Sequence, residues 1–395
     1  MADYYAEAIV AGHICLDVIP SFGGKDRAAS PQLLPGQLID VGPAVVTTGG
    51  VVSNTGIALH RLGVPTKLMG KVGDDWFGQA ILASLRQYGD RLASGMIVEP
   101  NGHSSYSIVL NPPNVDRIFL HCTGTNDTFA AADVKAELLG DAKLFHFGYP
   151  PLMRSMYADE GAELAALLSM VKGNGLTVSL DMAWPDPASE AGRADWRSIL
   201  AKALPSVDVF LPSFEEIRFM LRREQAAGDA PASDELLSSM ADELLEMGVA
   251  IVVIKLGEHG LYVKTTSDRK RIGAMGRCAA RIASDDSWIG RELWIPCYEV
   301  EVVGTTGAGD CTIAGFLAGL LNGAPLEQAL HVAVGVGACN VERTDATSGV
   351  PSWDAVRDRI AAGWAQKPMP PHWTGWAEDR AGKVFRRDAA RSAEA

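Results

Sequence analysis

The sequence predicts an α/β protein with a mostly parallel central sheet. Short apolar runs of strand length alternate along the chain with segments of helical periodicity. A chain that alternates strands and helices in this way folds as a parallel sheet with helices on both faces. The 395 residues, 47% of them hydrophobic, suffice for one large core or two domains. In sheets of this kind, ligands bind beyond the carboxyl ends of the strands.

The expected elements follow in order. The first is a buried strand over residues 8–12, with the apolar sequence Ala-Ile-Val-Ala-Gly. Later strands are expected at residues 143–147, 177–180, 207–211 and 250–254. Helical patterns are expected between them at residues 159–171, 214–223 and 235–247.

Three stretches interrupt the alternation. Residues 18–48 are rich in Gly, Pro and Ser, and residues 95–122 alternate polar and apolar side chains as antiparallel strands do. Residues 265–296 are polar and rich in Arg, which indicates a surface loop or hairpin. Residues 366–395 form a tail that is either partly disordered or docked on the body through Trp373 and Trp376.

The charge and the amino-acid composition narrow the range of partners and cellular locations that we expect. The formal net charge of −13 argues against a nucleic-acid partner. The six cysteines form no CxxC pair, which indicates reduced thiols. The first residues lack the features of a signal peptide, and no apolar run reaches the roughly 20 residues of a membrane helix. We therefore expect a cytoplasmic protein that binds neither membrane nor nucleic acid.

Residues 303–311, Val-Gly-Thr-Thr-Gly-Ala-Gly-Asp-Cys, carry the strongest functional signal. They lead directly into an apolar helical stretch, residues 312–321. The first amides of a helix lack internal partners, and glycine lets an anion approach them closely, so the segment can cradle an anion. Asp310 beside a bound polyphosphate either takes a proton from an attacking hydroxyl or only stabilises the helix start. This segment alone leaves both interpretations open.

A second motif, in residues 49–78, favours the interpretation of Asp310 as a base. Residues 49–63 read Gly-Gly-Val-Val-Ser-Asn-Thr-Gly-Ile-Ala-Leu-His-Arg-Leu-Gly, and residues 70–78 read Gly-Lys-Val-Gly-Asp-Asp-Trp-Phe-Gly. With Gly-Thr-Thr-Gly-Ala-Gly-Asp and the Ala-Gly-Phe that follows it, these blocks resemble the PfkB (ribokinase-like) carbohydrate kinases. The resemblance runs from about residue 7 to about residue 355.

The resemblance implies a ribokinase-like three-layer α/β/α fold with a small β-sheet lid. Residues 1–365 would form the kinase domain, and residues 366–395 a C-terminal tail. The lid would be built from about residues 17–48 and 95–123, which are otherwise ordinary surface hairpins. Because the lid of such kinases often pairs two subunits, a homodimer through the lid is implied.

The resemblance also assigns the chemistry. Asp310 matches the general base that deprotonates the acceptor hydroxyl. Gly307, Ala308 and Gly309 match the anion hole, whose backbone amides meet the charge on the transferred phosphoryl group.

Acceptor binding is assigned to the first half of the chain. Asp17 matches an aspartate that binds acceptor hydroxyls, and a carboxylate can accept more than one such proton. Gly49, Gly50 and Asn54 match the rest of the acceptor-binding block. Alternatively, Asp17 ends a strand in a turn, and the two glycines form a plain loop before a helix.

Nucleotide and metal binding are assigned to the second half. The resemblance implies that ATP contacts Lys255, Gly257, Gly260, Thr305 and Thr306. Glu216 matches an acid linked to Mg²⁺ through water, although Ser213 stands where the family has asparagine. Glu216 is otherwise an acid in the first turn of a helix, where the helix dipole favours negative charge.

Two departures from the family pattern bear on specificity. Gly304 stands where an aspartate commonly helps to hold a monovalent cation, which puts activation by K⁺ in doubt, although backbone carbonyls of residues 340–343 could still supply part of such a site. After one central strand, residues 181–185 read Asp-Met-Ala-Trp-Pro and lack the Asn and Arg that sugar-acid and fructose kinases of the family often carry there, which weakens an acidic-sugar assignment. Side chains after another strand, His146, Tyr149 and Pro150, are further candidates for the pocket wall.

The sequence as a whole indicates an ATP-dependent kinase that uses Mg²⁺ and phosphorylates a hydroxyl of a sugar or sugar derivative. A nucleoside kinase of the same family is the first alternative. A non-catalytic sensor of sugar or nucleotide on this fold is another, though the intact Asp310 argues against it. A nicotinamide dehydrogenase is disfavoured because no GxGxxG follows the first expected strand.

Overall fold

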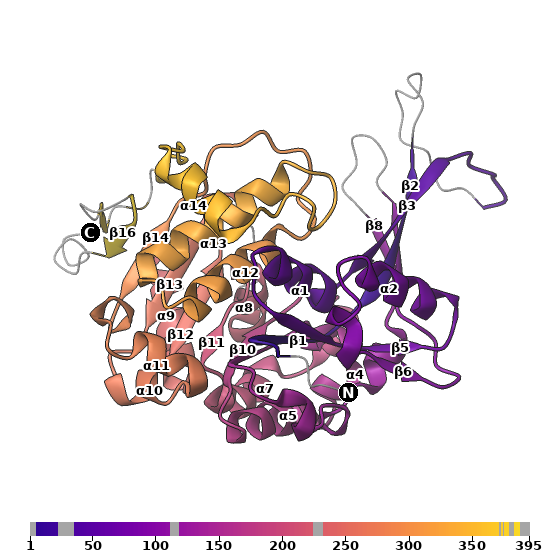
Figure 1. Ribbon diagram of the computed structural model, residues 1–395, viewed down its shortest axis with the longest axis horizontal. Helices are drawn as coiled ribbons and strands as arrows, with labels where there is room; N and C mark the ends of the chain where they lie inside the picture. Colours follow the sequence, from indigo (N-terminus) through magenta and orange to yellow (C-terminus); the bar gives the residue numbers. More distant parts are fainter. Residues whose placement is uncertain are drawn as a thin grey trace.

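The computed structural model describes residues 5–22, 35–110, 118–223, 232–370, 373, 375–378 and 383–387. A ten-stranded sheet lies at the centre of the molecule, with helices on both faces (Figure 1). In spatial order its strands are β15 (Trp376–Glu378), β16 (Phe385–Arg387), β14 (Glu292–Ile295), β13 (Leu261–Thr265), β12 (Ile251–Lys255), β11 (Val209–Phe210), β10 (Thr177–Asp181), β9 (Leu144–Gly148), β1 (Ala8–Gly12) and β4 (Thr66–Met69).

The strands from β12 to β4 pair in parallel, and those from β12 to β15 pair antiparallel. This arrangement confirms the mostly parallel sheet. Each strand expected from the sequence is present, although β11 is limited to two residues of the expected 207–211. All five residues of β1 are buried, as expected for a parallel strand that helices cover on both sides.

Two helical layers pack on the two faces and give the molecule three layers. One face carries α1 (Val51–Arg61), α10 (Arg269–Gly273), α11 (Ala279–Ile282), α12 (Ala308–Leu321), α13 (Leu326–Val341) and α14 (Trp353–Ala361). The other carries α3 (Ala136–Leu139), α4 (Arg154–Tyr157), α5 (Ala162–Gly173), α7 (Trp196–Ala203), α8 (Phe214–Leu221) and α9 (Asp234–Glu246), with the single turn α6 (Glu190–Arg193) before α7.

The core alternates between these layers along each strand. Ala8 and Val10 of β1 pack with the first layer, and Ile9 and Ala11 pack with the second. This is the period of two that a strand imposes on its side chains.

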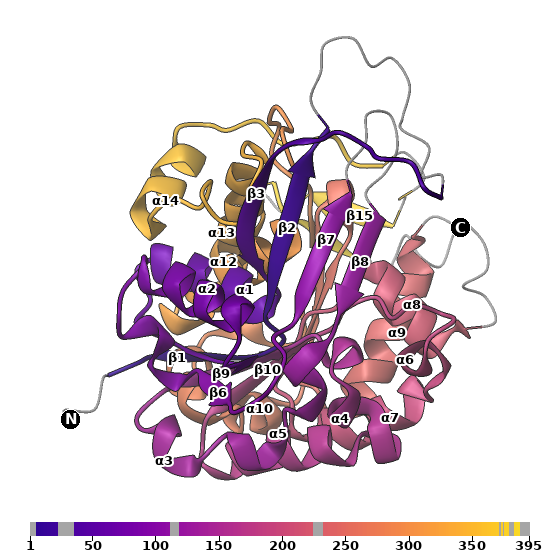
Figure 2. The same cartoon turned by 90° about the vertical axis from the view of Figure 1, so that its right-hand side faces the viewer.

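A second sheet of four strands stands beside the body, next to α2 (Trp76–Arg86) (Figures 1 and 2). Its order is β3 (Gly42–Gly49), β2 (Cys15–Ser21), β7 (Tyr106–Leu110) and β8 (Ile118–Cys122). These strands come from the two stretches expected to form the lid, and they confirm a small second sheet. Residues 23–34 and 111–117 of those stretches lie outside the described residues. A two-stranded parallel sheet, β5 (Lys71–Gly73) with β6 (Ile97–Glu99), completes the strands.

Residues 265–296 connect the antiparallel strands β13 and β14, as a hairpin does, but they are not the surface loop that was the other expectation. They contain α10, α11 and β14, and they bury Ile272, Ile282 and Trp288 completely. The polar composition has a physical reason, because Arg271 donates from Nη1 to the fully buried carboxylate of Asp208 at 2.7 Å. A buried carboxylate requires such a charged partner.

The described part of the tail continues the large sheet. Strands β15 and β16 extend it beyond β14, and Trp373 and Trp376 are only 3% and 2% exposed. Trp373 packs against Trp294 of β14, with ring centroids 5.1 Å apart. The expected disorder concerns the remaining tail residues, which lie outside the described ones.

Among the described residues, no helix combines the length and apolar character needed to cross a bilayer.

Candidate active site

Polar side chains from several elements gather at the carboxyl ends of the parallel strands. His13 follows β1, Tyr149 follows β9, Asp181 ends β10 and Lys255 ends β12. The helices α1 and α12 contact one another closely, and they begin at this edge of the sheet with Gly50 and Gly307 as their N-caps. The two sequence blocks, more than 200 residues apart, therefore meet at one place.

The start of α12 forms the cradle predicted from residues 303–311. Gly307 adopts φ +71°, a left-handed conformation that glycine adopts without strain. The amide of Ala308 donates to Thr305 O at 3.3 Å, and that of Cys311 donates to Gly307 O at 2.8 Å. Helix geometry leaves the amides of Gly309 and Asp310 between them without a helical partner, so they can receive an anion.

Asp310 lies in the first turn of α12 and is 5% exposed. Its Oδ2 accepts from Asn54 Nδ2 at 3.0 Å, and its Oδ1 accepts from Thr55 Oγ1 at 3.3 Å. The hydroxyl of Tyr149 donates to both oxygens, at 2.8 and 2.9 Å. Asp310 therefore joins the cradle to the predicted acceptor block.

Burial raises the pKa of Asp310 above its usual value. The hydrogen bonds from Asn54, Tyr149 and Thr55 and the positive charge of Lys255 oppose this increase. A carboxylate whose pKa is raised towards neutrality is a better general base than an ordinary aspartate.

The other predicted acceptor residues surround the approach to Asp310. A Cβ on Gly49 would lie 2.3 Å from Asp17 Oδ2, so the aspartate packs directly against this glycine. Gly50 has φ +87°, and a Cβ there would lie 2.6 Å from His13 Nδ1. Gly50 is thus required by its positive φ and its close packing, whereas a side chain at residue 49 would have to displace the Asp17 carboxylate. Burial raises the pKa of the partly buried Asp17, and the hydrogen bond from Cys15 Sγ, at 3.3 Å, opposes that increase.

Two histidines complete this side of the site. His13 Nε2 lies 3.3 Å from His121 Nε2 of β8, and His121 Nδ1 lies 3.0 Å from Ser107 Oγ of β7. Burial lowers the pKa of both imidazoles, so they are neutral near pH 7. The buried Nδ1 of His13 and Oδ1 of Asn54 have no partner among the described residues. They remain available to a ligand's hydroxyl groups.

A pocket of about 350 Å³ lies on the other side of the cradle. Four of the residues predicted to bind the nucleotide line it: Lys255, Gly257, Gly260 and Thr305. Thr306 lies beside it and accepts from Asn340 Nδ2 through its backbone oxygen at 2.9 Å. The structure thus brings the predicted nucleotide residues together.

Lys255 reaches from this pocket to the cradle. Its Nζ lies 2.6 Å from Asp181 Oδ1, and it is 3.9 Å from the position that a Cβ on Gly309 of the cradle would take. Although burial lowers its pKa, the carboxylates of Asp181 and Glu216 raise the pKa of Lys255 above the usual value. Lys255 is therefore charged and can attract a phosphate group to the start of α12.

Glu216 has a structural partner already. Its Oε2 accepts from the Ser213 backbone amide at 2.7 Å, and Ser213 Oγ accepts from the Glu216 amide at 3.3 Å, a capping box that begins α8. Within the described residues there is no group of three or more His, Cys, Asp or Glu that could hold a metal by themselves.

Gly304 has no room for the side chain of an aspartate. A Cβ there would lie 2.8 Å from the backbone oxygen of Arg343 and 3.1 Å from Thr344 Cα. The segment after α13 therefore fills the space that a carboxylate at residue 304 would need, and the residues present do not fit the family's cation site.

Sequence reasoning missed the contacts of Tyr149, His13 and His121. Tyr149 was only one of three candidates for the pocket wall. Its position directly after an expected strand was the feature that could have indicated a residue of the site. His146, a second candidate, is instead fully buried within the sheet, with Nδ1 2.7 Å from Ser179 Oγ. No pattern pointed to the two histidines, because their pairing depends on how the small sheet sits over β1.

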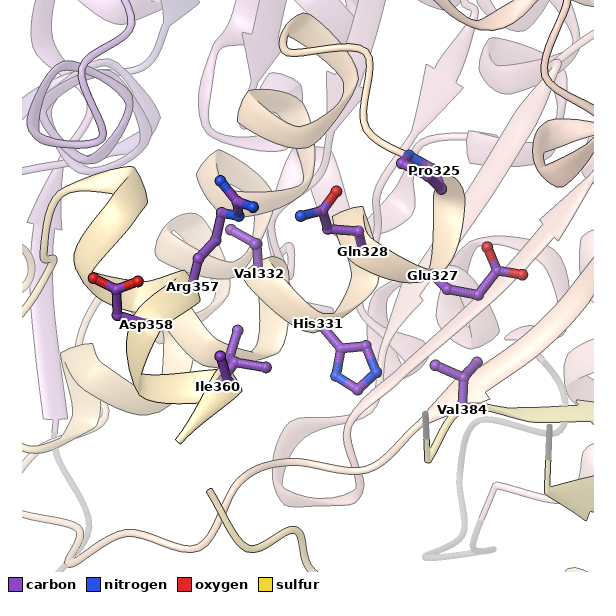
Figure 3. Close-up of a pocket in the computed structure, with 10 residues that line it drawn as sticks. Pro325, Glu327, Gln328, His331, Val332, Arg357, Asp358, Ile360 and Val384 are labelled. Atoms are coloured by element: carbon purple, nitrogen blue, oxygen red, sulfur yellow. The ribbon is translucent and has the colours of Figure 1, made fainter. Parts of the chain in front are cut away.

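A second pocket, of about 670 Å³, lies between α13 and α14 (Figure 3). Glu327, Gln328 and His331 of α13 and Arg357 and Ile360 of α14 line it (Figure 3). None of the site residues predicted from the sequence is among its lining residues.

The arrangement suits one class of chemistry. A buried carboxylate with a raised pKa lies between a cluster of hydrogen-bonding side chains and a pocket beside the start of α12. The fold is that of a ribokinase-like kinase. The sequence pattern described as "pfkB family carbohydrate kinase" matches residues 18–353, and the chain belongs to this family of carbohydrate kinases.

Individual relatives agree with the family. Probable fructokinase-7 of Arabidopsis thaliana is 26% identical over 367 residues, covering 89% of this chain and 91% of that protein. The structure of Arabidopsis thaliana ribokinase with ribose and ATP has TM-score 0.67 at 17% identity, covering 89% of this chain and 98% of that one. A putative ribokinase II from E. coli in complex with ATP and Mg²⁺ has TM-score 0.66 at 21% identity, covering 91% of this chain and 100% of that one. Both structures share the ribokinase-like fold.

Proposed function

We propose that this carbohydrate kinase transfers the γ-phosphoryl group of ATP to a hydroxyl of an uncharged sugar or sugar derivative. The observation that carries the proposal is the position of Asp310. This one carboxylate lies in the first turn of the cradle helix and is hydrogen bonded to Asn54 of the acceptor block. A base in that place reaches both the attacking hydroxyl and the phosphoryl group.

The residues of the chain divide the reaction between them. Asp310 accepts the proton of the acceptor hydroxyl while the hydroxyl oxygen bonds to the γ-phosphorus. The bond from that phosphorus to the β-phosphate oxygen breaks, and ADP leaves with the electron pair. The amides of Gly309 and Asp310 and the ammonium group of Lys255 receive the charge of the transferred group, since preorganised donors stabilise it without reorganisation.

Nucleotide and metal would be held by the second half of the chain. Lys255, Gly257, Gly260, Thr305 and Thr306 would contact ATP. When bound, Mg²⁺ neutralises part of the charge on the phosphate oxygens, and Glu216 would hold it through water. Because no carboxylate fits at residue 304, we propose that a monovalent cation such as K⁺ is not required.

The groups around the acceptor favour a neutral polyol. Asp17, Asn54 and the neutral imidazoles of His13 and His121 offer hydrogen bonds without positive charge. A sugar acid would bring its carboxylate next to Asp17 and Asp310, and like charges at short distance are costly. This supports an uncharged sugar over an acidic one.

The small sheet supports a homodimer through the lid. Val45 and Val46 of β3 are 58% and 55% exposed, and Leu120 of β8 is 52% exposed. Exposed apolar side chains on a sheet that stands away from the body are typical of an interaction surface. Sedimentation of the protein and of the Val46→Lys variant tests this, and a monomeric parent protein would contradict it.

The decisive experiment measures ADP release from Mg·ATP over a panel of neutral sugars, sugar acids, polyols and nucleosides. The blank is Asp310→Asn, and the matched control is Asp358→Asn, an exposed carboxyl on α14. A neutral sugar that stimulates the parent and the control but not Asp310→Asn would support the proposal. Stimulation by nucleosides alone would shift it to a nucleoside kinase. Full turnover by Asp310→Asn would remove Asp310 as the base.

A further inference from the structure

The contact between Tyr149 and Asp310 goes beyond what the reaction needs. Tyr149 directly follows β9 and precedes Pro150, and its backbone has φ 66° and ψ 40°. A left-handed conformation is uncommon and strained for a bulky residue, and such strain concentrates at functional sites. The strained conformation brings the phenol to the predicted base.

The phenol uses the acceptor positions that the base needs for its work. An ionised carboxylate has about four positions at which it accepts hydrogen bonds. Asn54 and Thr55 take one each, and Tyr149 contacts both oxygens at 2.8 and 2.9 Å. The phenol has a single proton, which the two oxygens share, so it competes with an acceptor hydroxyl for the positions that Asn54 and Thr55 leave.

Of the three partners, Tyr149 is the one that can leave. Asn54 and Thr55 are fixed within α1, and both are almost completely buried. Tyr149 is only partly buried and lies outside the regular elements of the sheet, with its ring 6.0 Å from that of His13. Burial and the charge of Asp310 also raise the pKa of its phenol, which therefore keeps its proton and remains a donor.

We propose that Tyr149 holds the place of the acceptor hydroxyl on Asp310 and that the bound acceptor displaces it. This inference rests on the proposed function, and it makes Tyr149 a positioning residue. Until the acceptor arrives, the phenol keeps water from the base and so limits idle hydrolysis of ATP. Displacement also relieves the strained backbone of Tyr149, which offsets part of the lost hydrogen bonding.

The pH dependence of turnover tests the displacement directly. At saturating Mg·ATP, kcat/KM for the acceptor reports the pKa of the base before the acceptor binds, and kcat reports it in the complex. A hydrogen bond donated to a carboxylate lowers its pKa. Removing the phenol in Tyr149→Phe should therefore move the acid limb of kcat/KM upward by up to about one pH unit. The acid limb of kcat should stay in place, since the acceptor has already displaced the phenol.

The other groups that face Asp310 remain in this variant. They are Lys255 from β12, Asp181 from β10 and Glu216 from α8, besides Asn54 and Thr55 from α1. A shift confined to kcat/KM therefore reports the phenol.

A second measurement is ADP release without acceptor. It should rise by about tenfold or more in Tyr149→Phe, because water gains access to the base. Tyr157→Phe on α4 is the matched control and should show neither change. Tyr149→Leu also removes the hydroxyl and serves if the phenylalanine variant does not fold.

Three results would overturn the inference. Equal shifts in kcat and kcat/KM would mean that the phenol stays on Asp310 in the complex. Unchanged ADP release together with unchanged acid limbs of both pH profiles would mean that the phenol does not affect the base. A fall in acceptor-independent ADP release would mean that Tyr149 assists hydrolysis. These outcomes are distinct from failure of the proposed function, in which Asp310→Asn itself would turn over the acceptor.

Discussion

Replacing Gly309 by alanine should make the protein more stable and less active. Gly309 is the second residue of α12, and its φ does not lie in the left-handed region. The nearest atoms to an added Cβ are Cδ of Lys255 at 3.6 Å and Cε and Nζ of the same residue at 3.9 Å. These are ordinary contacts, so the methyl group fits. Alanine within a helix is favoured over glycine by about 0.5–1 kcal/mol, and the free energy of unfolding should increase by that amount.

The same methyl group lies where a phosphate has to approach. It would stand between the open amides at the start of α12 and the ammonium group of Lys255. Donors in an anion hole act at about 2.7–3.1 Å from the oxygen, and loss of one such donor typically lowers kcat by about 10²–10³-fold. We expect a loss of that order for phosphoryl transfer by Gly309→Ala.

The assay pairs urea unfolding with steady-state ADP release in the presence of the acceptor. Gly173→Ala, at the end of α5, is the control, because no atom lies within 4 Å of its added Cβ and it is far from the site in the fold. It should not change turnover. If Gly309→Ala keeps the turnover of the parent protein, α12 does not receive the phosphoryl group at this residue and the cradle assignment is refuted.

Three further predictions address the acceptor, the cation and acid stability. Asp17→Asn should raise KM for the acceptor several-fold and leave KM for ATP unchanged; equal effects on both would contradict the assignment of Asp17. Replacing K⁺ by a bulky organic cation should change the rate little, because no carboxylate fits at Gly304, and a large loss would show that backbone oxygens suffice. His146 should destabilise the protein in acid. Burial and the charge of Lys255 lower its pKa from 6.5 to about 3, so between these values the unfolded chain binds the additional proton. Stability is then lost as the pH falls below 6.5, by about 2 kcal/mol at pH 5. We expect the free energy of unfolding, measured in urea at pH 7 and pH 5, to fall less in the double variant His146→Leu, Ser179→Ala than in the parent protein. Equal losses in the two proteins would contradict the prediction.

The sequence predicted the parts of the site that depend on local backbone chemistry. The cradle follows from glycines at a helix start, and Asn54 and Asp310 follow from two blocks whose residue order is distinctive. The parallel strands then bring these blocks to one edge of the sheet. Such features are legible because each depends on a short segment and on the rule that the carboxyl ends of parallel strands share an edge.

What the sequence did not reveal depends on side chains that meet across the fold. Tyr149 reaches Asp310 only because its backbone is left-handed, and nothing in the sequence Gly-Tyr-Pro-Pro requires that. His121 reaches His13 because β7 pairs with β2 in parallel, a register that no local pattern fixes. The burial of part of residues 265–296 was missed for a similar reason. Arg271 in this segment pairs with the buried Asp208, which lies on another part of the chain.

The two sides of α12 explain how an acidic protein can bind a polyanion. The nucleotide side has the open helix amides and Lys255, whose charge is held in place by Asp181. The acceptor side has the carboxylates of Asp17 and Asp310, together with the neutral imidazoles of His13 and His121. Phosphate is therefore attracted to one side and repelled from the other, whereas a hydroxyl group is accepted by the carboxylates. Under the proposed function, this separation of charge across one helix terminus orients both substrates, and it depends on local groups and not on the net charge of −13.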